Sequence, residues 1–275
     1  MVIQILLMRA IVVLVVLVPR DFGPGVCDGS LVLGNMMLAA HSLGLGSCWI
    51  HRAKEEFDSA EGKAILKSLG IEGIWLTPIF KSPSYHKYDA VDYYKIDERF
   101  GSMDDLKELL SLCHQRNVKV ILDLVYFHCG PKAVFLEKHK DFVKCDENGE
   151  IIYGEWQFPT LNFENLALRE YLWQNMEYYV KDFNVDGYRC DVAYLCPTDF
   201  WEEGRKRIEK IKPDVFMLNE GENKDALKCA FDANYHYDYI HKTKAAFGGY
   251  GNANEIVEAC KEMRKTIPED KTLIR

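Results

Sequence analysis

The sequence predicts an α/β protein that forms part of a parallel (β/α)8 barrel, and three observations support this fold class. Predicted strands alternate with predicted helices from residue 71 onward, the strands are almost continuously apolar, and long loops follow several of them. Alternating apolar strands and helices are typical of a parallel sheet covered by helices. Long loops after the strands favour a barrel. The alternative is a doubly wound sheet, but no glycine-rich phosphate loop follows any strand.

The first 70 residues predict a separate α/β fragment. Its elements in order are a strand at 11–18, a buried helix at 28–43, a strand starting at 47–50 and a helix at 55–69. Together with Ala10 the apolar run at 11–18 covers only nine residues, which is too short to span a bilayer. No small-x-small cleavage site follows it. We therefore expect neither a membrane segment nor a signal peptide here.

Residues 71–275 predict the barrel part. The expected strands lie at 71–80, 118–125, 185–192 and 214–218, and another begins at 272. The expected helices lie at 103–116, 166–183, 198–211 and 254–266. Ser102 and Asn165 are placed to cap two of these helices, because their side chains can accept hydrogen bonds from free backbone N–H groups.

Composition limits the classes of function. The chain of 275 residues has a formal charge of −8 and no basic stripe, which argues against a nucleic-acid partner. Its nine cysteines are odd in number and scattered without a C-x-x-C pair, so neither a zinc site nor a disulfide framework is indicated. A reducing cytoplasm is the simplest compartment for such a chain.

The strand predicted at 185–192 has a pair of oppositely charged residues near its end. Arg189 and Asp191 are two positions apart, so their side chains point to the same face. Burying this pair is costly unless the two groups bind each other. One interpretation is a structural ion pair. The other is an aspartate that the guanidinium keeps ionised, as a carboxylate nucleophile requires.

Other charged groups end neighbouring predicted strands. Asp123 and His128 follow one strand and Glu220 follows another. Since the ends of parallel barrel strands meet on one face, we expect these groups to lie near Arg189 and Asp191. Two carboxylates in different surroundings suit glycoside cleavage, with Asp191 as nucleophile and Glu220, less compensated by positive charge, as acid/base. Retention of configuration would follow, with carboxyl groups about 5–5.5 Å apart.

Four motifs carry a resemblance to the α-amylase family of glycoside hydrolases. They are Y-D-A-V-D-Y at 88–93 followed by F-G at 100–101, V-I-L-D-L-V-Y-F-H at 120–128, D-G-Y-R-C-D at 186–191 and F-M-L-N-E at 216–220. The stretch W-Q-F-P-T-L-N at 156–162 is similar to the family's loop before the nucleophile helix. The resemblance covers about residues 70–275.

The resemblance implies a retaining hydrolase or transglycosylase that acts on an α-glucan oligosaccharide. It implies Asp191 as nucleophile and Glu220 as acid/base. Substrate contacts would come from the remaining motif residues and the position after the nucleophile motif: Tyr88, Asp123, His128, Arg189 and Tyr194. Tyr194-Leu195 stand where many amylases have Lys-His, so recognition on the leaving-group side must differ.

The chain also departs from the family pattern. The family's N-H-D motif is absent, and only strands two to six of eight, with the start of a seventh, have counterparts. An inactive chain is therefore an alternative to an active enzyme. Phe127 replaces the family's Asn before the motif histidine, which argues against the calcium that many members bind. We expect no metal site.

The segment N-M-M-L-A-A-H-S-L-G-L-G-S-C-W-I at 35–50 resembles the nitroreductase family, and the resemblance covers about residues 11–70. It raises the alternative of an FMN-dependent reductase. In that family the basic contacts to the flavin phosphate come largely from an N-terminal segment, and nothing before residue 11 resembles it. We therefore expect no FMN site in this chain.

Overall fold

The computed structural model describes residues 72–268 and 270–274. The chain divides into two compact units, Met1–Ala64 and Ile65–Arg275, and every described residue belongs to the second unit. The elements predicted between residues 11 and 69 lie outside the described residues.

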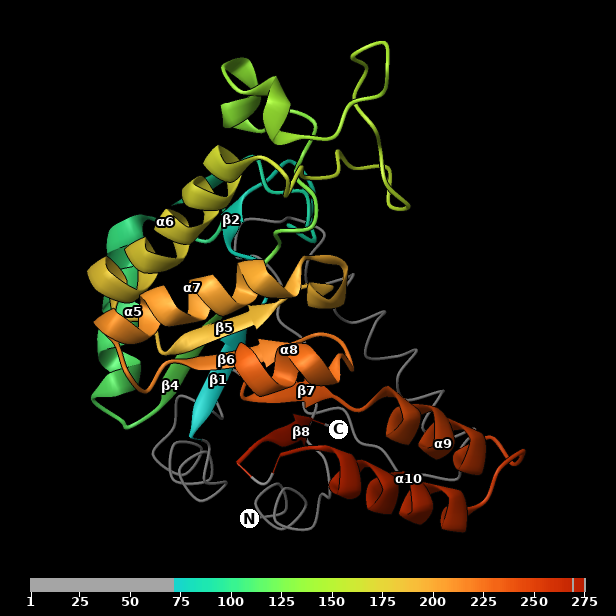
Figure 1. Cartoon of the computed structure of the whole chain (residues 1–275). Helices are drawn as coiled ribbons and strands as arrows, with labels where there is room; N and C mark the ends of the chain where they lie inside the picture. Colours follow the sequence, from blue (N-terminus) through green and yellow to red (C-terminus); the bar gives the residue numbers. More distant parts are fainter. Residues whose placement is uncertain (1–71, 269, 275) are drawn as a thin grey trace, which may run out of the picture. The chain divides into compact units, whose positions relative to one another are not determined.

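A six-stranded parallel sheet forms the centre of the second unit (Figure 1). Its strands, in spatial order, are β1 (Gly73–Leu76), β4 (Lys119–Leu124), β5 (Gly187–Cys190), β6 (Phe216–Asn219), β7 (Ala233–Tyr235) and β8 (Thr272–Ile274). This order follows the sequence without a reversal, and each neighbouring pair is parallel. The sheet curls into a half-barrel. The partial-barrel prediction is confirmed, and the doubly wound alternative is wrong because that fold needs a point where the strand order reverses.

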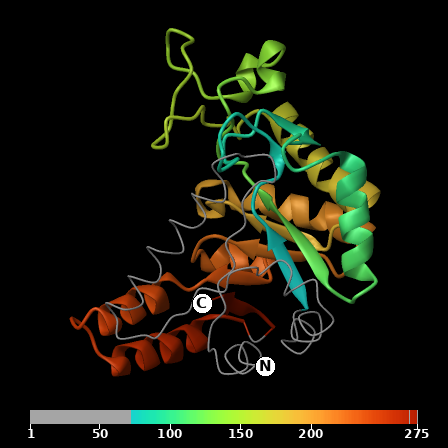
Figure 2. The ribbon, with the colours of Figure 1, turned by 180° about the vertical axis from the view of Figure 1, so that it is seen from behind.

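Helices α5 (Met103–His114), α6 (Leu166–Phe183), α7 (Thr198–Ile211) and α8 (Lys224–Cys229) cover one face of this sheet, and the opposite face is seen from behind in Figure 2. Two helices begin at the predicted caps. Ser102 forms a reciprocal capping box with Asp105, and the Asn165 side chain accepts from two backbone N–H groups of the first turn. Each cap satisfies N–H groups that have no partner within the helix.

Some elements were not predicted. The expected loop at 81–100 contains an antiparallel pair, β2 (Phe80–Lys81) and β3 (Asp92–Ile96). Between β6 and β8 the structure adds α8, β7 and α9 (Tyr237–Phe247), which precedes the expected helix, α10 (Ala253–Thr266). The described residues also form three short 3-10 turns: η1 (Val134–Glu137), η2 (Lys140–Phe142) and η3 (Ala193–Leu195).

The core lies between the sheet and its helices. Leu122, Tyr188 and Met217 on three adjacent strands are fully buried, as is Trp201 on α7. Gly187 allows β5 to approach β6 closely, because a Cβ at this position would lie 1.9 Å from the carbonyl oxygen of Phe216. Any larger residue here would push the two strands apart at the point where β5 begins.

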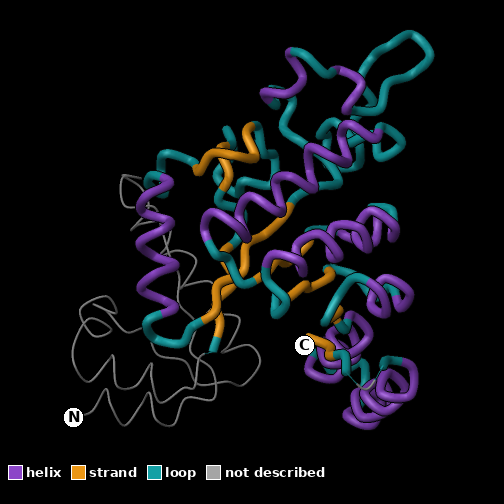
Figure 3. Tube along the Cα trace, turned by 60° about the vertical axis from the view of Figure 1, so that its left-hand side comes forward, coloured by secondary structure: helices purple, strands orange, loops and turns teal. Residues whose placement is uncertain are grey.

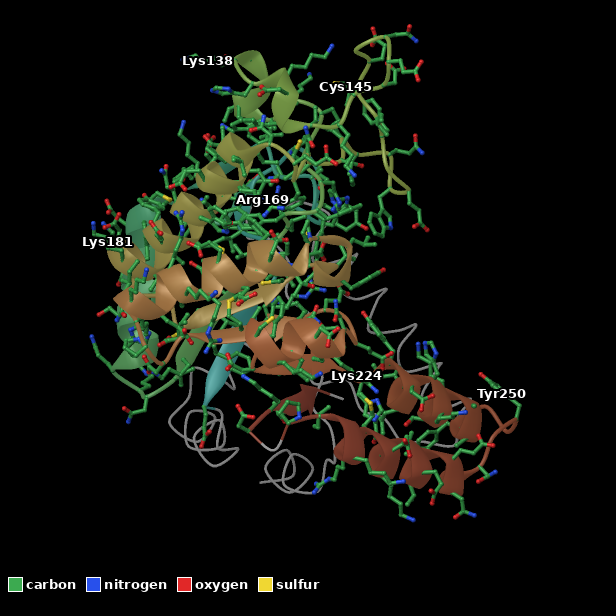
Figure 4. The ribbon with its side chains drawn as sticks, in the orientation of Figure 1. Lys138, Cys145, Arg169, Lys181, Lys224 and Tyr250 are labelled. Atoms are coloured by element: carbon green, nitrogen blue, oxygen red, sulfur yellow. The ribbon has the colours of Figure 1, made fainter. Side chains whose placement is uncertain are left out.

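The segment between β4 and α6 makes a long excursion from the end of β4 (Figure 3). Cys145 lies on its outer part (Figure 4). Isolated antiparallel bridges hold the excursion together, including one between His128 and Thr160 and one between Tyr153 and Pro159. These bridges fix the residues around Trp156 next to the carboxyl ends of the strands. Within the described part of the chain, no helix combines the length and the apolarity needed to cross a membrane.

Candidate active site

Neighbouring strands bring the predicted charged residues together. Asp123 on β4 lies directly opposite Arg189 on β5 in the strand register. Asp191 follows β5 immediately, and Glu220 follows β6. This register brings the groups at the ends of the parallel strands to one face, as the sequence predicts.

The guanidinium of Arg189 contacts all three carboxylates. Its Nη1 lies 2.8 and 3.0 Å from the two carboxylate oxygens of Asp123 and 2.7 Å from Oδ1 of Asp191. Its Nη2 lies 2.6 Å from Oε2 of Glu220. The side chain of Arg189 is only 4% exposed, so these contacts are made largely without water.

This geometry confirms the contact between Arg189 and Asp191. It contradicts the expectation that Glu220 is less compensated, because the same guanidinium binds Glu220 as well. One buried cation therefore faces up to three negative charges. With all three carboxyl groups ionised the cluster has a net charge of −2, and each proton bound to a carboxyl group lowers this excess by one.

Three aromatic rings surround the guanidinium. Its central carbon lies 5.0 Å from the ring centre of Trp75, 5.8 Å from that of Tyr235 and 6.0 Å from that of Tyr88. A guanidinium binds hydrogen-bond acceptors in its plane and aromatic rings on its faces. The rings therefore hold Arg189 in place while its N–H groups reach the carboxylates.

The surroundings shift the pKa values of two carboxyl groups upward. Burial raises the pKa of Asp191 to about 7, although the charge of Arg189 opposes this shift. Burial likewise raises the pKa of Asp123 to about 6, again against Arg189. Asp191 is therefore partly protonated near neutral pH in the free chain, and it becomes fully ionised only at higher pH.

A cavity of about 520 Å³ opens at this cluster. It is lined by His86, Tyr88, His128, Trp156, Phe158, Arg189, Asp191, Val192 and Glu220. Both predicted catalytic carboxylates and three of the five predicted substrate-binding residues thus lie on its wall.

Two predicted substrate-binding residues do not line this cavity. The side chain of Asp123 is fully buried, and its contacts are to Arg189 and to the hydroxyl of Tyr88, at 3.2 Å. Tyr194 lies on η3 and is 50% exposed. The structure corrects the direct sugar contact expected for Asp123, because burial leaves its carboxylate no free surface.

His128 is held by its neighbours on the cavity wall. One ring nitrogen, Nε2, lies 2.9 Å from the carbonyl oxygen of Tyr88, and the ring stacks on Phe158 with a centroid distance of 5.1 Å. Burial lowers the pKa of His128, which favours the neutral imidazole. A carbonyl oxygen can only accept, so Nε2 carries the hydrogen and Nδ1 is left as an acceptor. Nδ1 is buried and has no partner among the described residues.

Sequence reasoning did not anticipate the contribution of Val192. This residue has φ 38° and ψ 42°, in the left-handed region that β-branched residues rarely adopt. Its backbone N–H donates to Oε2 of Glu220 at 2.8 Å. Strained backbone is often found at functional sites. No side-chain motif in the sequence could have indicated this contact.

Phe127 provides no oxygen ligand at the position before the motif histidine. The described residues contain no group of three or more acidic, histidine or cysteine side chains arranged to hold a metal. Phe127 presents its ring to Trp156, with a centroid distance of 6.1 Å, where an amide oxygen would be a ligand. No step proposed below passes through a metal.

Two protein-family models match the chain. The α-amylase catalytic-domain model matches residues 64–150, and the nitroreductase family model matches residues 25–77. The two matches overlap at residues 64–77.

Among curated proteins, a maltogenic α-amylase of Bacillus acidopullulyticus is 39% identical over an alignment of 178 residues that covers 56% of this chain and 30% of the relative. A cyclomaltodextrinase of Geobacillus thermopakistaniensis is 37% identical over 173 residues, covering 56% of this chain and 29% of the relative. The chain thus spans about 30% of the length of these curated relatives.

Among solved structures, a maltogenic α-amylase from Thermotoga neapolitana matches with a TM-score of 0.72 and 29% identity, covering 81% of this chain and 54% of that one. An α-amylase from Lactobacillus plantarum matches with a TM-score of 0.71 and 29% identity, covering 76% of this chain and 56% of that one.

Proposed function

We propose that this chain, an α-amylase-type catalytic segment preceded by a nitroreductase-like segment, is a retaining glycoside hydrolase or transglycosylase acting on α-glucans. The observation that carries the proposal is the contact of one buried arginine with two cavity-lining carboxylates, Asp191 and Glu220. The names of the relatives, maltogenic amylase and cyclomaltodextrinase, support an α-glucan oligosaccharide as substrate.

The first half of the proposed reaction forms a glycosyl-enzyme. The ionised carboxylate of Asp191 attacks the anomeric carbon of the bound sugar, and Glu220 gives its proton to the leaving glycosidic oxygen as the carbon–oxygen bond breaks. The guanidinium of Arg189 favours the ionised form of Asp191, and the positive charge that develops on the sugar does so too. The positive charge that develops on the sugar as the bond breaks therefore opposes the effect of burial on Asp191.

The second half releases the product. Glu220, now ionised, takes a proton from a water molecule, which attacks the anomeric carbon and frees Asp191. When the hydroxyl of another sugar replaces water, the outcome is transglycosylation. Asp191 is regenerated as a carboxylate in both cases.

The cavity wall offers the contacts that this reaction needs. Tyr88 and His128 line it together with Arg189, and we propose that they hold the sugar ring at the cleavage point. Trp156 is 41% exposed, and its ring provides an apolar face of the kind that sugar rings stack on. We propose that Tyr194 contacts the sugar on the leaving-group side, and that Asp123 acts through Arg189.

The experiment is hydrolysis of maltotriose by the full chain and its variants. Asp191→Asn and Glu220→Gln should each lower kcat by at least roughly 10²-fold, the scale seen when one transition-state group is removed. Asp199→Asn is the matched control, because this aspartate is 69% exposed and pairs with Arg169 away from the cavity. Full activity of Asp191→Asn would contradict its assignment as nucleophile. An inactive parent chain would favour the non-catalytic alternative.

A second candidate is a flavin-dependent reductase, which the nitroreductase match at residues 25–77 favours. A bound flavin would test this candidate, because it absorbs blue light and gives the purified protein a yellow colour. We expect a colourless protein that does not retain added FMN on gel filtration. Retention of FMN at one molecule per chain would establish the second candidate. For the compartment we propose the cytoplasm, since one relative is named an intracellular maltogenic amylase.

A further inference from the structure

The two carboxylate oxygens of Glu220 have different partners. Oε2 lies 2.6 Å from Nη2 of Arg189 and 2.8 Å from the backbone nitrogen of Val192. Oε1 lies 3.4 Å from the hydroxyl of Tyr237, the first residue of α9. Glu220 is thus bound from three separate directions.

This difference decides which oxygen can carry a proton. A guanidinium and a backbone N–H group are donors only, so Oε2 must accept from both. A proton on Oε2 would displace one of these donors. A tyrosine hydroxyl can donate to a carboxylate oxygen or accept from a protonated one. Oε1 is therefore the oxygen that can hold a proton without losing its partner.

We propose that Tyr237 is a positioning residue that holds Oε1 of Glu220 as the proton-carrying oxygen of the acid/base. This inference rests on the proposed function. Tyr237 is itself well placed for the task, because its ring packs edge-on against Tyr235 with a centroid distance of 5.7 Å. The capping of α9 by the His236 side chain fixes the backbone on which Tyr237 stands.

The hydroxyl of Tyr237 stays neutral throughout the reaction. Burial raises its pKa well above the ordinary value, and the negative charge of Glu220 adds to this shift. In the first half-reaction the proton on Oε1 passes to the leaving oxygen, and Tyr237 changes from acceptor to donor. In the second half-reaction Oε1 takes a proton from the attacking water, and Tyr237 becomes an acceptor again. Tyr237 neither gains nor loses a proton overall.

A comparison of two leaving groups tests this role. Maltotriose needs a proton on its leaving oxygen, whereas the fluoride of α-maltosyl fluoride leaves without one. We expect Tyr237→Phe to lower kcat/KM for maltotriose about tenfold, a part of the usual effect of general acid catalysis. For maltosyl fluoride we expect a change of less than about twofold, since that reaction does not use the acid.

Tyr250→Phe is the matched control. Tyr250 is 78% exposed and lies at the turn between α9 and α10 (Figure 4). This variant should leave both rates unchanged. An equal loss on both substrates in Tyr237→Phe would indicate a merely structural residue and overturn the proposal. Unchanged rates on both substrates would overturn it as well.

A measurement without turnover separates this proposal from the proposed function. The Cδ carbon of Glu220 can be followed by ¹³C NMR and assigned by its absence in Glu220→Gln. We expect Tyr237→Phe to change the chemical shift of this signal, because the carboxyl group loses the hydroxyl next to Oε1, and Tyr250→Phe to leave it unchanged. Identical chemical shifts for all three chains would overturn the role of Tyr237 even when both substrates are cleaved. A changed chemical shift in a chain that cleaves neither substrate would support the role of Tyr237 while the proposed function fails.

Discussion

Arg189 and Asp123 lie opposite each other on adjacent parallel strands, and Nη1 of Arg189 contacts both carboxylate oxygens of Asp123, at 2.8 and 3.0 Å. The contact lies beneath the cavity, because the Asp123 side chain is fully buried. The same guanidinium reaches Asp191 and Glu220 on the cavity wall. Arg189 therefore links the core of the sheet to the groups proposed to carry the reaction.

Removing Arg189 should destabilise the chain strongly. In Arg189→Met three carboxylates lose their shared cation, and breaking a buried ion pair in this way costs about 3–5 kcal/mol. The loss should be smaller at pH 5 than at pH 8, because protonation relieves the carboxylates. Urea unfolding of Arg189→Met and of the wild type at the two pH values measures this loss of stability. Lys206→Met is the control, since it breaks an exposed pair with Glu202 and should leave the urea midpoint almost unchanged.

Neutralising Asp191 should stabilise the chain at high pH. Burial raises the pKa of Asp191 to about 7, above its value in the unfolded chain. The wild-type chain therefore loses stability as pH rises from about 4 through about 7, the range over which the folded state binds the additional proton. We expect Asp191→Asn to be more stable than wild type at pH 8, by on the order of 4 kcal/mol, and equal to it near pH 4. A less stable variant at pH 8 would contradict the upward shift.

Asp186 directly precedes β5, the strand that Asp191 follows. Its contribution to stability should depend on pH in the opposite sense to that of Asp191. Burial alone would raise its pKa, but hydrogen bonds from Lys212, the Val120 backbone and His114 lower it to about 2. Its contribution is therefore present above about pH 4 and is lost as pH falls toward about 2. Asp186→Asn should be less stable than wild type at pH 6, by on the order of 1 kcal/mol, and the difference should narrow between pH 4 and pH 3. A difference that is constant over this range would rule out the lowered pKa.

The rate of glycosyl transfer should depend on pH through Asp191. With maltosyl fluoride, whose departure needs no acid, kcat/KM reports the nucleophile of the free enzyme. Because only the ionised carboxylate attacks and the pKa of Asp191 is raised to about 7, kcat/KM should rise with pH and level off above about 7. Asp199→Asn should give the same profile as wild type. A profile that is already flat at pH 5 would contradict the role of the buried carboxyl group.

Much of the framework could be predicted from the sequence because its signals are local. Asn165 and Ser102 cap helices where expected, and the helix predicted at 198–211 has the same bounds as α7. The sequence contains weaker indications of helix α9. Its cap is the side chain of His236, which is not one of the usual capping residues, and none of its residues is buried. The strand β7 is only three residues long, so it offers little alternation to detect.

Five of the predicted site residues line the cavity, but sequence reasoning missed two contacts of the charged cluster. Arg189 and Asp191 are two residues apart, and this spacing predicts that their side chains point to the same face. The contact between the two side chains confirms it. The partnership of Arg189 with Asp123 depends on the register between two strands, which no local pattern specifies. The hydrogen bond from the Val192 backbone to Glu220 depends on the left-handed backbone conformation of Val192. A valine side chain does not indicate that conformation in a sequence.

The measurement that tests the central claim most directly is the capture of the glycosyl-enzyme. In Glu220→Gln, maltosyl fluoride should still react with Asp191, while the second half-reaction slows because no base activates water. Mass spectrometry of the digested chain should then find a maltosyl group on the peptide that contains Asp191, and none in the double variant that adds Asp191→Asn. The absence of any adduct in Glu220→Gln, or an adduct on a carboxylate other than Asp191, would contradict the account.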